Sequence, residues 1–409
     1  MTIRRTPEDF RVEERTTAAF QSSLAQARAP SHPFAAYLLE KKSLATPDAL
    51  RAIADALKVA PAAIAAAGLK DRHAHTTQTV TIDTAHLRRE APERLQGGGE
   101  GHAWRMKRTG FAPRAADASI IERNLFTILV RGLDKRGYDE MGRRAAVFAN
   151  REGGVDFVNY FGDQRFGSAR HGQGFVGAAL VRGDFEQALR LAIGTPARKD
   201  SGATRALTRA LATHWGDWAK ALAHTPRCPE RKAVETLAQG GSFLDAFAAL
   251  PRFTQEICVE AYQSHLWNGI VRDLAHALGE TTAQRAYEVD DAFGALVFPR
   301  AAALTPAFRA LAIALPSPKS TYPECLSEIV AGVLGDEGVA LEELRIPGLS
   351  RPWFGGGERR FVATALEWSL SEPMHDEYAG ASPNAIACTV RFSLPRGSYA
   401  TVLLRALGQ

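Results

Sequence analysis

The chain has 409 residues, of which 45% are hydrophobic, so it can bury at least one large core and is long enough for roughly two to three domains. Its 50 Lys and Arg residues exceed its 45 Asp and Glu residues, and this net charge of +5 permits a polyanionic partner without requiring one. We find neither the run of roughly 18 apolar residues that a membrane helix needs nor an apolar secretory signal behind the charged start. The sequence predicts a cytoplasmic protein with no membrane partner.

The cysteines exclude two further classes of protein. Cys228, Cys258, Cys325 and Cys388 lie far apart, and none of them forms a CxxC pair. Neither a disulfide framework nor a cysteine zinc site is therefore indicated, and buried free thiols are expected.

The first 150 residues mix helical and strand patterns, which favours an α+β domain. Thr46 can cap a helix that has Pro47 at its first position, and a second short helix is expected over residues 61–67. Gly68 would end that helix. Threonines then alternate with Gln78, Val80 and Ile82, which is the period of a half-buried strand.

The remainder of the chain divides into a helical part and a closing α/β part. A strand over residues 125–131 and a glycine-rich hairpin or loop tip at 96–101 still belong to the first part. Helical patterns follow over residues 185–193, 203–214, 233–237, 253–278 and 341–344. Gly279 is expected to end the fourth of these, and alternation returns in a strand over 387–394 and a helix over 399–407. Strand-rich ends around a helix-rich middle indicate an inserted domain.

Asp71 is the first candidate for chemistry, because it lies on a loop between two cations, Lys70 and Arg72, which hold a carboxylate ionised. Spacing alone favours a turn cap or a surface ion pair for such a residue. The string GLKDRHAHTTQ, residues 68–78, resembles the signature G-x-K-D-[KR]-x-A-x-T-x-Q of the TruD family of pseudouridine synthases at every fixed position. The resemblance implies that Asp71 is the catalytic aspartate and that Lys70, Arg72 and Gln78 surround the substrate.

A second string, NYFGDQRFG at residues 159–167, interleaves polar and aromatic side chains. Its aromatics can form a hydrophobic plug or hold an unstacked base. The string resembles the TruD motif N-Y-F-G-x-Q-R-F-G, which implies that Asn159 and Phe161 line the uridine pocket. Val158 departs from the family pattern, since many members have proline before the asparagine.

The opening segment RRTPEDFRVEE resembles the start of TruD proteins and implies active-site positions for Arg4 and Phe10. Phe10 can equally anchor the terminus in the core. We expect Arg4 or a neighbouring cation to pair with Asp71 and keep it ionised. Residues 260–268 and 391–401 also look like TruD sequence, and Tyr262, Leu266 and Trp267 in the first of these stretches are expected in the core.

Basic clusters at residues 88–89, 105–108, 143–144 and 359–360, some beside Trp104 or Phe361, can bind phosphates and stack on bases, although such clusters are also common on solvated surfaces. His73 and His75 form an H-x-H pair without an acidic or cysteine partner at ligand spacing, so no metal site is expected. Neither a G-x-S-x-G elbow nor a P-loop is present.

The resemblance implies an α+β pseudouridine synthase domain with a central mixed, largely antiparallel sheet and flanking helices, plus a helix-rich inserted TRUD-type domain. The expected boundaries are 1–175 and 349–409 for the catalytic domain and 176–348 for the insertion. The implied activity is isomerisation of a specific uridine in tRNA, with position 13 as the expected target, through an aspartate and base flipping.

The implied chemistry uses no cofactor, the expected partner is tRNA, and no obligatory protein partner is evident. Attack of Asp71 on C6 of the base and a route through a glycal both fit the residues. Two other functions remain open at this point. One is an RNA-binding or RNA-folding factor without turnover, and the other is a glycosidic-bond hydrolase that uses the same aspartate.

Overall fold

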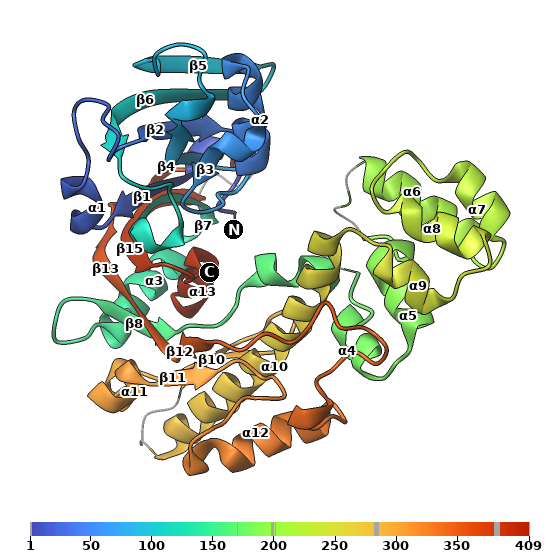
Figure 1. Cartoon of the computed structure of the whole chain (residues 1–409). Coiled ribbons are helices and arrows are strands. Elements are labelled where there is room, and N and C mark those ends of the chain that lie inside the picture. The colour runs from blue at the N-terminus through green and yellow to red at the C-terminus, as the bar shows by residue number, and fades with distance from the viewer. Residues whose placement is uncertain are drawn as a thin grey trace. The chain divides into compact units, whose positions relative to one another are not determined.

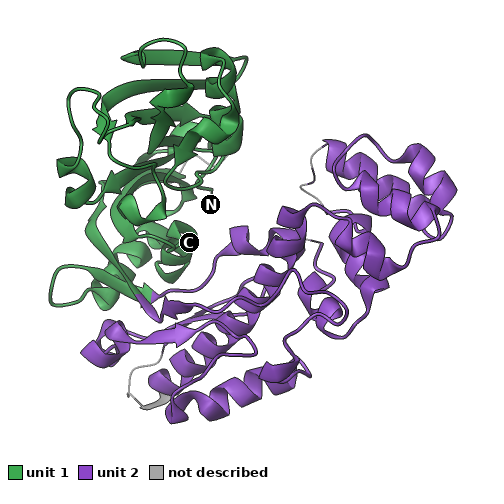
Figure 2. Ribbon diagram, viewed as in Figure 1, with its two compact units in different colours: residues 1–157, 363–409 green, residues 158–362 purple. Residues whose placement is uncertain are grey.

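The computed structural model describes residues 2–169, 171–197, 200, 202–281, 286–379 and 385–408. The chain folds into two compact units, one of residues 1–157 and 363–409 (unit 1) and one of residues 158–362 (unit 2) (Figure 2). Both ends of the chain thus belong to unit 1. We expected the domain boundaries after residues 175 and 348, whereas the chain divides into its compact units after residues 157 and 362.

Unit 1 is built on an 11-stranded sheet of the described residues, with the order β5-β6-β2-β4-β1-β7-β15-β13-β8, while β3 pairs with β4 and β14 with β15 (Figure 1). The strands are β1 Phe10–Thr16, β2 Phe34–Lys42, β3 Ile64–Ala66, β4 His75–Asp83, β5 Arg94–Gly99, β6 His102–Ala112, β7 Ile121–Leu133, β8 Val155–Val158, β13 Val362–Leu370, β14 Met374–His375 and β15 Ile386–Pro395. β1 and β4 are parallel, and β1–β7, β2–β4, β2–β6 and β7–β15 are antiparallel. The expected mixed, largely antiparallel sheet is confirmed.

Helices flank this sheet. They are α1 Ala18–Ser22, α2 Thr46–Leu57, α3 Lys135–Phe148 and α13 Ala400–Ala406. α2 has an amphipathic pattern, and its Ala49 and Ile53 are fully buried in one core cluster with Tyr37 of β2 and Val80 of β4. The same cluster contains Ile64 of β3, so α2 packs against both strands, β3 and β4, that flank the loop of Asp71.

Two local predictions in unit 1 are wrong. Residues 61–67 do not form a helix, because Pro61–Ala63 is a single 3-10 turn and Ile64–Ala66 pairs as β3 with residues 80–82 of β4. Thr46 is not the cap of α2 either, since Ala45 takes that position. The Thr46 hydroxyl instead accepts a hydrogen bond from the backbone N–H of Lys70. The glycine-rich segment at 96–101 is part of the β5–β6 hairpin.

Unit 2 is mainly helical. Its helices are α4 Val176–Val181, α5 Phe185–Leu189, α6 Gly202–His214, α7 Trp218–His224, α8 Arg231–Ala238, α9 Phe243–Ala248, α10 Arg252–Thr281, α11 Pro306–Ala310 and α12 Glu324–Asp336. Two small sheets pair β9 Tyr287–Val289 with β10 Leu296–Phe298, and β11 Ala312–Ala314 with β12 Glu358–Arg360. α10 is the longest helix and contacts α4 and α12, as Figure 1 shows.

The helical predictions over residues 203–214, 233–237 and 253–278 agree with these elements apart from their ends. The predicted helix over 185–193 is α5 followed by a π-helical turn, Arg190–Gly194. The prediction over 341–344 is wrong, because Leu341–Glu343 is a single 3-10 turn. Tyr262, Leu266 and Trp267 are fully buried on α10, which confirms their expected place in the core. Gly279 does not end this helix, which continues to Thr281. Among the described residues, no helix is both long and apolar enough to cross a membrane.

Candidate active site

Asp71 lies on the loop between β3 and β4, and the antiparallel pairing of these strands fixes both ends of the loop. Its Oδ2 accepts a hydrogen bond from Nη2 of Arg4 at 3.0 Å, which confirms the expected pairing of these two residues. The carboxylate is 33% exposed and the guanidinium 29% exposed. Asp71 is therefore a charged group that a bound molecule can reach.

A buried lysine holds the backbone of this loop. Lys41 on β2 is 1% exposed. Its Nζ donates to the carbonyl oxygens of Leu44 at 2.6 Å, Lys70 at 3.2 Å and Asp71 at 2.9 Å. Burial lowers the pKa of Lys41 to about 8, and the nearby Asp71 charge opposes that shift. The carbonyls of Lys70 and Asp71 belong to the peptide groups on the two sides of Asp71, so this one ammonium fixes both of them.

Thr46 and Gln78 fix the start of the same loop. The backbone N–H of Lys70 donates to Oγ1 of Thr46 at 2.9 Å, and that hydroxyl donates to Oε1 of Gln78, also at 2.9 Å. The Gln78 amide in turn donates to the carbonyl of Gly68 at 3.0 Å. Gln78 is fully buried, and both its amide oxygen and its amide nitrogen form hydrogen bonds that hold the start of this loop.

Lys70 and Arg72, the two cations beside Asp71, have different surroundings. The side chain of Lys70 is 8% exposed and forms an ion pair of 2.8 Å with Glu14, which is itself buried. Its Nζ also donates to Oδ1 of Asn124 at 2.8 Å. Arg72 is 60% exposed and pairs with Asp48. Lys70 is thus part of the interior, whereas Arg72 is at the surface.

Phe10 lies under the guanidinium that pairs with Asp71. It is the first residue of β1 and is 3% exposed. The guanidinium carbon of Arg4 lies 4.3 Å from the centre of the Phe10 ring, a cation–π distance, and Phe10 packs edge-on against Phe126. One ring therefore anchors the terminal segment in the core and also supports Arg4.

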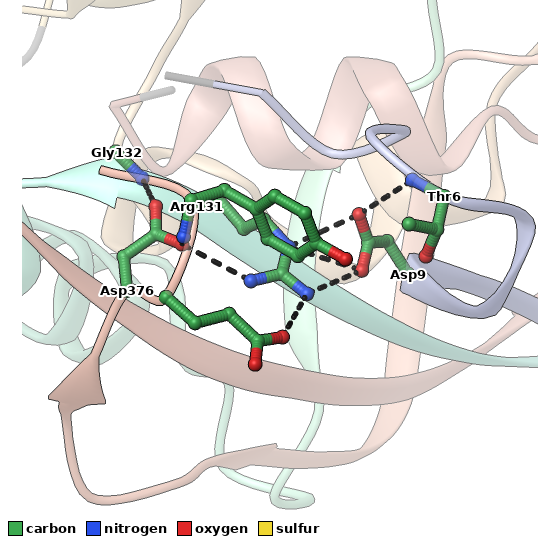
Figure 3. Close-up of polar contacts among 7 residues, drawn as sticks. Thr6, Asp9, Arg131, Gly132 and Asp376 are labelled. Atoms are coloured by element: carbon green, nitrogen blue, oxygen red, sulfur yellow. Dashed lines mark hydrogen bonds and ion pairs between the residues drawn. The ribbon is translucent and has the colours of Figure 1, made fainter. Parts of the chain in front are cut away.

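A buried ion cluster holds the segment before Phe10 in place (Figure 3). Arg131 on β7 donates to both carboxylate oxygens of Asp9 at 2.9–3.1 Å and to Asp376 at 3.0 Å. The backbone N–H of Thr6 donates a further hydrogen bond to Asp9, and that of Gly132 donates one to Asp376, at 2.9 Å each. Burial alone would raise the pKa of Asp9, but the hydrogen bonds from Arg131 and Thr6 outweigh it and lower that pKa.

Unit 2 contains the other candidate residues, Asn159 and Phe161. Oδ1 of Asn159 accepts from Nη2 of Arg359 at 2.8 Å, and the same arginine donates to the Asn159 backbone carbonyl through Nε at 2.7 Å. Asn159 donates through Nδ2 to the carbonyl of Arg360. It is 6% exposed, so Arg359 and its strand hold both the side chain and the backbone of this residue.

Phe161 is held by the side-chain amide of Asn268 on α10. Oδ1 of Asn268 accepts from the Phe161 N–H at 2.9 Å, and Nδ2 donates to the Phe161 carbonyl at 3.0 Å. The Phe161 ring meets Trp267 edge-on with centroids 5.5 Å apart, and the guanidinium carbon of Arg359 lies 4.2 Å from its centre. Phe161 is 9% exposed and belongs to an aromatic and cationic cluster.

Sequence reasoning missed Lys41, Glu14 and Asn268, and it treated Arg359 only as part of a basic cluster. Lys41 carried a usable signal, because it is a lysine at an inward position of an otherwise apolar strand pattern. Asn268 closes the TruD-like stretch of residues 260–268, but its partner is 107 residues away along the chain, so the local pattern does not reveal the contact. His75 pairs with Glu40 at 2.8 Å, and no group of three or more metal-ligating side chains occurs among the described residues.

Comparisons with known proteins agree with this arrangement of motifs. The family model described as tRNA pseudouridine synthase D (TruD) matches residues 1–407. The chain is 32% identical over 384 residues to "Probable tRNA pseudouridine synthase D" of Methanopyrus kandleri, which covers 92% of this chain and 85% of that protein. It is 29% identical over 381 residues to "tRNA pseudouridine synthase D" of Aquifex aeolicus, with 91% of each covered.

A solved structure from Methanosarcina mazei, described under the same family name, has the same fold. Its TM-score is 0.66 at 24% identity, with 99% of this chain and 92% of that chain covered. The match of the family model thus extends over nearly the whole chain and includes all three motifs around Asp71, Asn159 and Arg4. The chain belongs to the TruD family of tRNA pseudouridine synthases.

Proposed function

We propose that this protein isomerises uridine to pseudouridine in tRNA, with the uridine at position 13 as its target and Asp71 as its catalytic carboxylate. One observation carries the proposal. Asp71 is a reachable carboxylate, paired with Arg4 at 3.0 Å, on a loop whose backbone is bound by the buried Lys41. A carboxylate held in one position suits a reaction in which it must be aligned with one reacting carbon atom of the substrate.

The reaction breaks the bond from C1′ to N1, turns the uracil within the site and forms a bond from C1′ to C5. The proton that leaves C5 balances the one gained at N1, so no oxidant, reductant or cofactor is consumed. Attack of Asp71 on C6 and assistance of a glycal route both require an ionised carboxylate. Arg4 places a cation 3.0 Å from that carboxylate.

The target base must leave its stack to reach Asp71, which costs a few kcal/mol that contacts with the protein offset. We assign Phe161 and Asn159 to the flipped uridine, Phe10 and Arg4 to the wall beside Asp71, and Arg72 to a phosphate. Lys70 and Gln78 are enclosed, so their proposed part is to hold the loop that the substrate meets.

We also assign the catalytic domain to residues 1–157 and 363–409 and the inserted TruD-type domain to residues 158–362, which follows the compact units instead of the junctions at 175 and 348. We further propose that the protein is cytoplasmic and that it acts on tRNA without an obligatory protein partner.

The test is conversion of an unmodified tRNA transcript by the purified full chain, read by carbodiimide labelling of pseudouridine at each position. We expect labelling at position 13 with the wild type and none with Asp71→Asn, while tRNA binding by the variant stays within about twofold. Near-normal conversion by Asp71→Asn contradicts the assignment of Asp71. Free uracil in the supernatant indicates a hydrolase, and binding without conversion by the wild type indicates an RNA-binding factor.

A further inference from the structure

Unit 2 has a pocket beside the first turns of α10 that no part of the proposed reaction uses. Its volume is about 340 Å³, within the range of roughly 300–1,000 Å³ that is typical of small-ligand sites. It is lined by Arg165, Arg252, Gln255, Glu256, Glu260, Gln263, Leu315, Arg351, Pro352, Trp353, Gly355 and Gly356. The pocket combines an aromatic ring, three guanidinium groups and two side-chain amides.

Trp353 is the prominent residue of this pocket. Its neighbour Phe354 is 5% exposed and packs edge-on against Tyr262 of α10, whereas Trp353 itself is 55% exposed. Gln263 on α10 donates to the carbonyl of Gly355 at 2.7 Å and so fixes the same loop. A single exposed aromatic residue needs no explanation, but this indole is held at the edge of a formed pocket.

The polar groups of the pocket suit a nucleotide. The Arg351 guanidinium lies 4.6 Å from the centre of the Trp353 indole, and a flat base can stack on either plane. Arg165 pairs with Glu260 at 2.7 Å and Arg252 with Glu256 at 2.6 Å, so three cations against two anions leave one net positive charge for a phosphate.

Two buried glutamines add acceptors to the wall. Gln255 is 9% exposed and Gln263 is 4% exposed, and the Nε2 atom of each donates to two backbone carbonyls. Among the described residues nothing donates to the Oε1 atom of either side chain. These oxygens remain as acceptors for the N–H groups of a base.

Arg165 connects this pocket with the proposed uridine site. It lines the pocket, and its guanidinium carbon also lies 5.5 Å from the centre of the Phe161 ring. We propose that the pocket binds a second unpaired nucleotide of the same RNA strand, close to the flipped uridine, with its base stacked on Trp353. This inference rests on the proposed function, because it takes Phe161 as the partner of the target base.

The first experiment compares the full-length variants Trp353→Ala and Trp353→Phe by tRNA binding and steady-state kinetics. We expect Trp353→Ala to raise Kd and KM about tenfold and leave kcat within twofold, since the stack contributes to binding and not to the chemical step. Trp353→Phe keeps a ring and should recover most of the loss. Phe253→Ala is the matched control, because Phe253 is 68% exposed on α10 and does not line the pocket.

The second experiment identifies the nucleotide. Abasic substitutions are placed one at a time at the positions flanking the target uridine, and Kd is measured for the wild type and for Trp353→Ala. At one position the abasic change should weaken wild-type binding about tenfold and leave Trp353→Ala binding unchanged, which is the non-additivity of a direct contact. Additive losses at every position, or unchanged Kd and KM in Trp353→Ala, overturn the proposal.

These outcomes separate the inference from the proposed function. If the wild type forms no pseudouridine in any tRNA, the proposed function fails, while the binding measurements still decide whether Trp353 contacts RNA. If the wild type converts tRNA but Trp353→Ala binds and converts it equally well, the proposed second nucleotide site is contradicted and the proposed function is not. A lower kcat with unchanged Kd in Trp353→Ala also contradicts the assignment, because it indicates a structural effect on the chemistry.

Discussion

Lys41 and Asp71 meet through the backbone, since Nζ of the buried lysine donates to the Asp71 carbonyl at 2.9 Å while the Asp71 carboxylate pairs with Arg4. The backbone of Asp71 is therefore held by Lys41 and its side chain by Arg4. Lys41 touches no group that the proposed substrate would occupy, and we assign it a positioning role.

Replacement of Lys41 by Met should lower kcat about 100-fold with little change in the Kd for tRNA, because a displacement of about 1 Å in a reacting group costs that much. Single-turnover conversion and equilibrium binding measure the two effects. Lys42→Met is the control, since Lys42 is adjacent and half exposed. Equal losses in both variants contradict the positioning role.

The pH dependence of Lys41 gives opposite signs for activity and stability. The pKa of this residue is lowered from 10.5 to about 8, so the wild type should lose turnover as pH rises through about 8 and the ammonium becomes an amine. Between about 8 and 10.5 the unfolded chain binds more protons than the folded one, so the Lys41 contribution to the free energy of unfolding rises with pH. Urea denaturation of the wild type and Lys41→Met from pH 7 to 10 checks the sign, and a difference that falls with pH contradicts it.

Loss of Arg4 should reduce turnover with almost no effect on stability. Its pair with Asp71 is about one-third exposed, and such pairs contribute only ~0–1 kcal/mol to folding. We expect Arg4→Ala to lower kcat about 10- to 100-fold, because a charged donor to the reacting carboxylate is removed, and Arg4→Lys to keep part of the activity. Arg5→Ala serves as the neighbouring control. Full turnover by Arg4→Ala rules out this role for Arg4.

The Asp9–Arg131 pair should matter for stability more than for chemistry. Asp9→Asn leaves Arg131 buried with one charge partner fewer, and breaking such a pair costs about 3–5 kcal/mol. Glu377→Gln tests the same arginine at its exposed side, where the carboxylate is 73% exposed and 3.5 Å away, and should cost below about 0.5 kcal/mol. Urea denaturation at pH 7 compares the two, and equal losses contradict the buried role.

The same pair predicts an acid response. The pKa of Asp9 is lowered below its ordinary value of 3.8, so its stabilisation is present above that value and is lost as pH falls below it. The wild type should therefore lose stability more steeply than Asp9→Asn below about pH 4. Parallel acid denaturation curves for the two proteins contradict this expectation.

Removal of the Asn268 amide should disturb Phe161 without touching its ring. Asn268→Ala removes the two hydrogen bonds that its amide forms with the N–H and the carbonyl of Phe161, at a cost of about 0.5–1.5 kcal/mol each. We expect a higher KM for tRNA and a lower melting temperature. His276→Ala, at an exposed position on the same helix, is the control for general effects on α10. An unchanged KM means that Asn268 does not position Phe161 for binding.

The limits of the sequence prediction are physical. Strands such as β4 and β7 were recognised because alternation and β-branched residues act locally. Ile64–Ala66 was mistaken for helix because its strand conformation depends on pairing with β4, which a local pattern does not contain. The Asp71–Arg4 pair followed from charge and family motif, whereas the buried contacts of Lys41 and Asn268 depend on tertiary packing alone.

The pairing of β15 with β7 has a consequence for the order in which the protein matures. β7 Ile121–Leu133 lies between β1 and β15, and β15 ends at Pro395. Residues 158–362 leave the ribosome before residues 363–409 and can fold as a unit, while the sheet of unit 1 still lacks its strand β15. A nascent chain stalled before residue 386 should therefore contain a folded inserted unit and no active catalytic domain, which couples the onset of activity to the synthesis of β15.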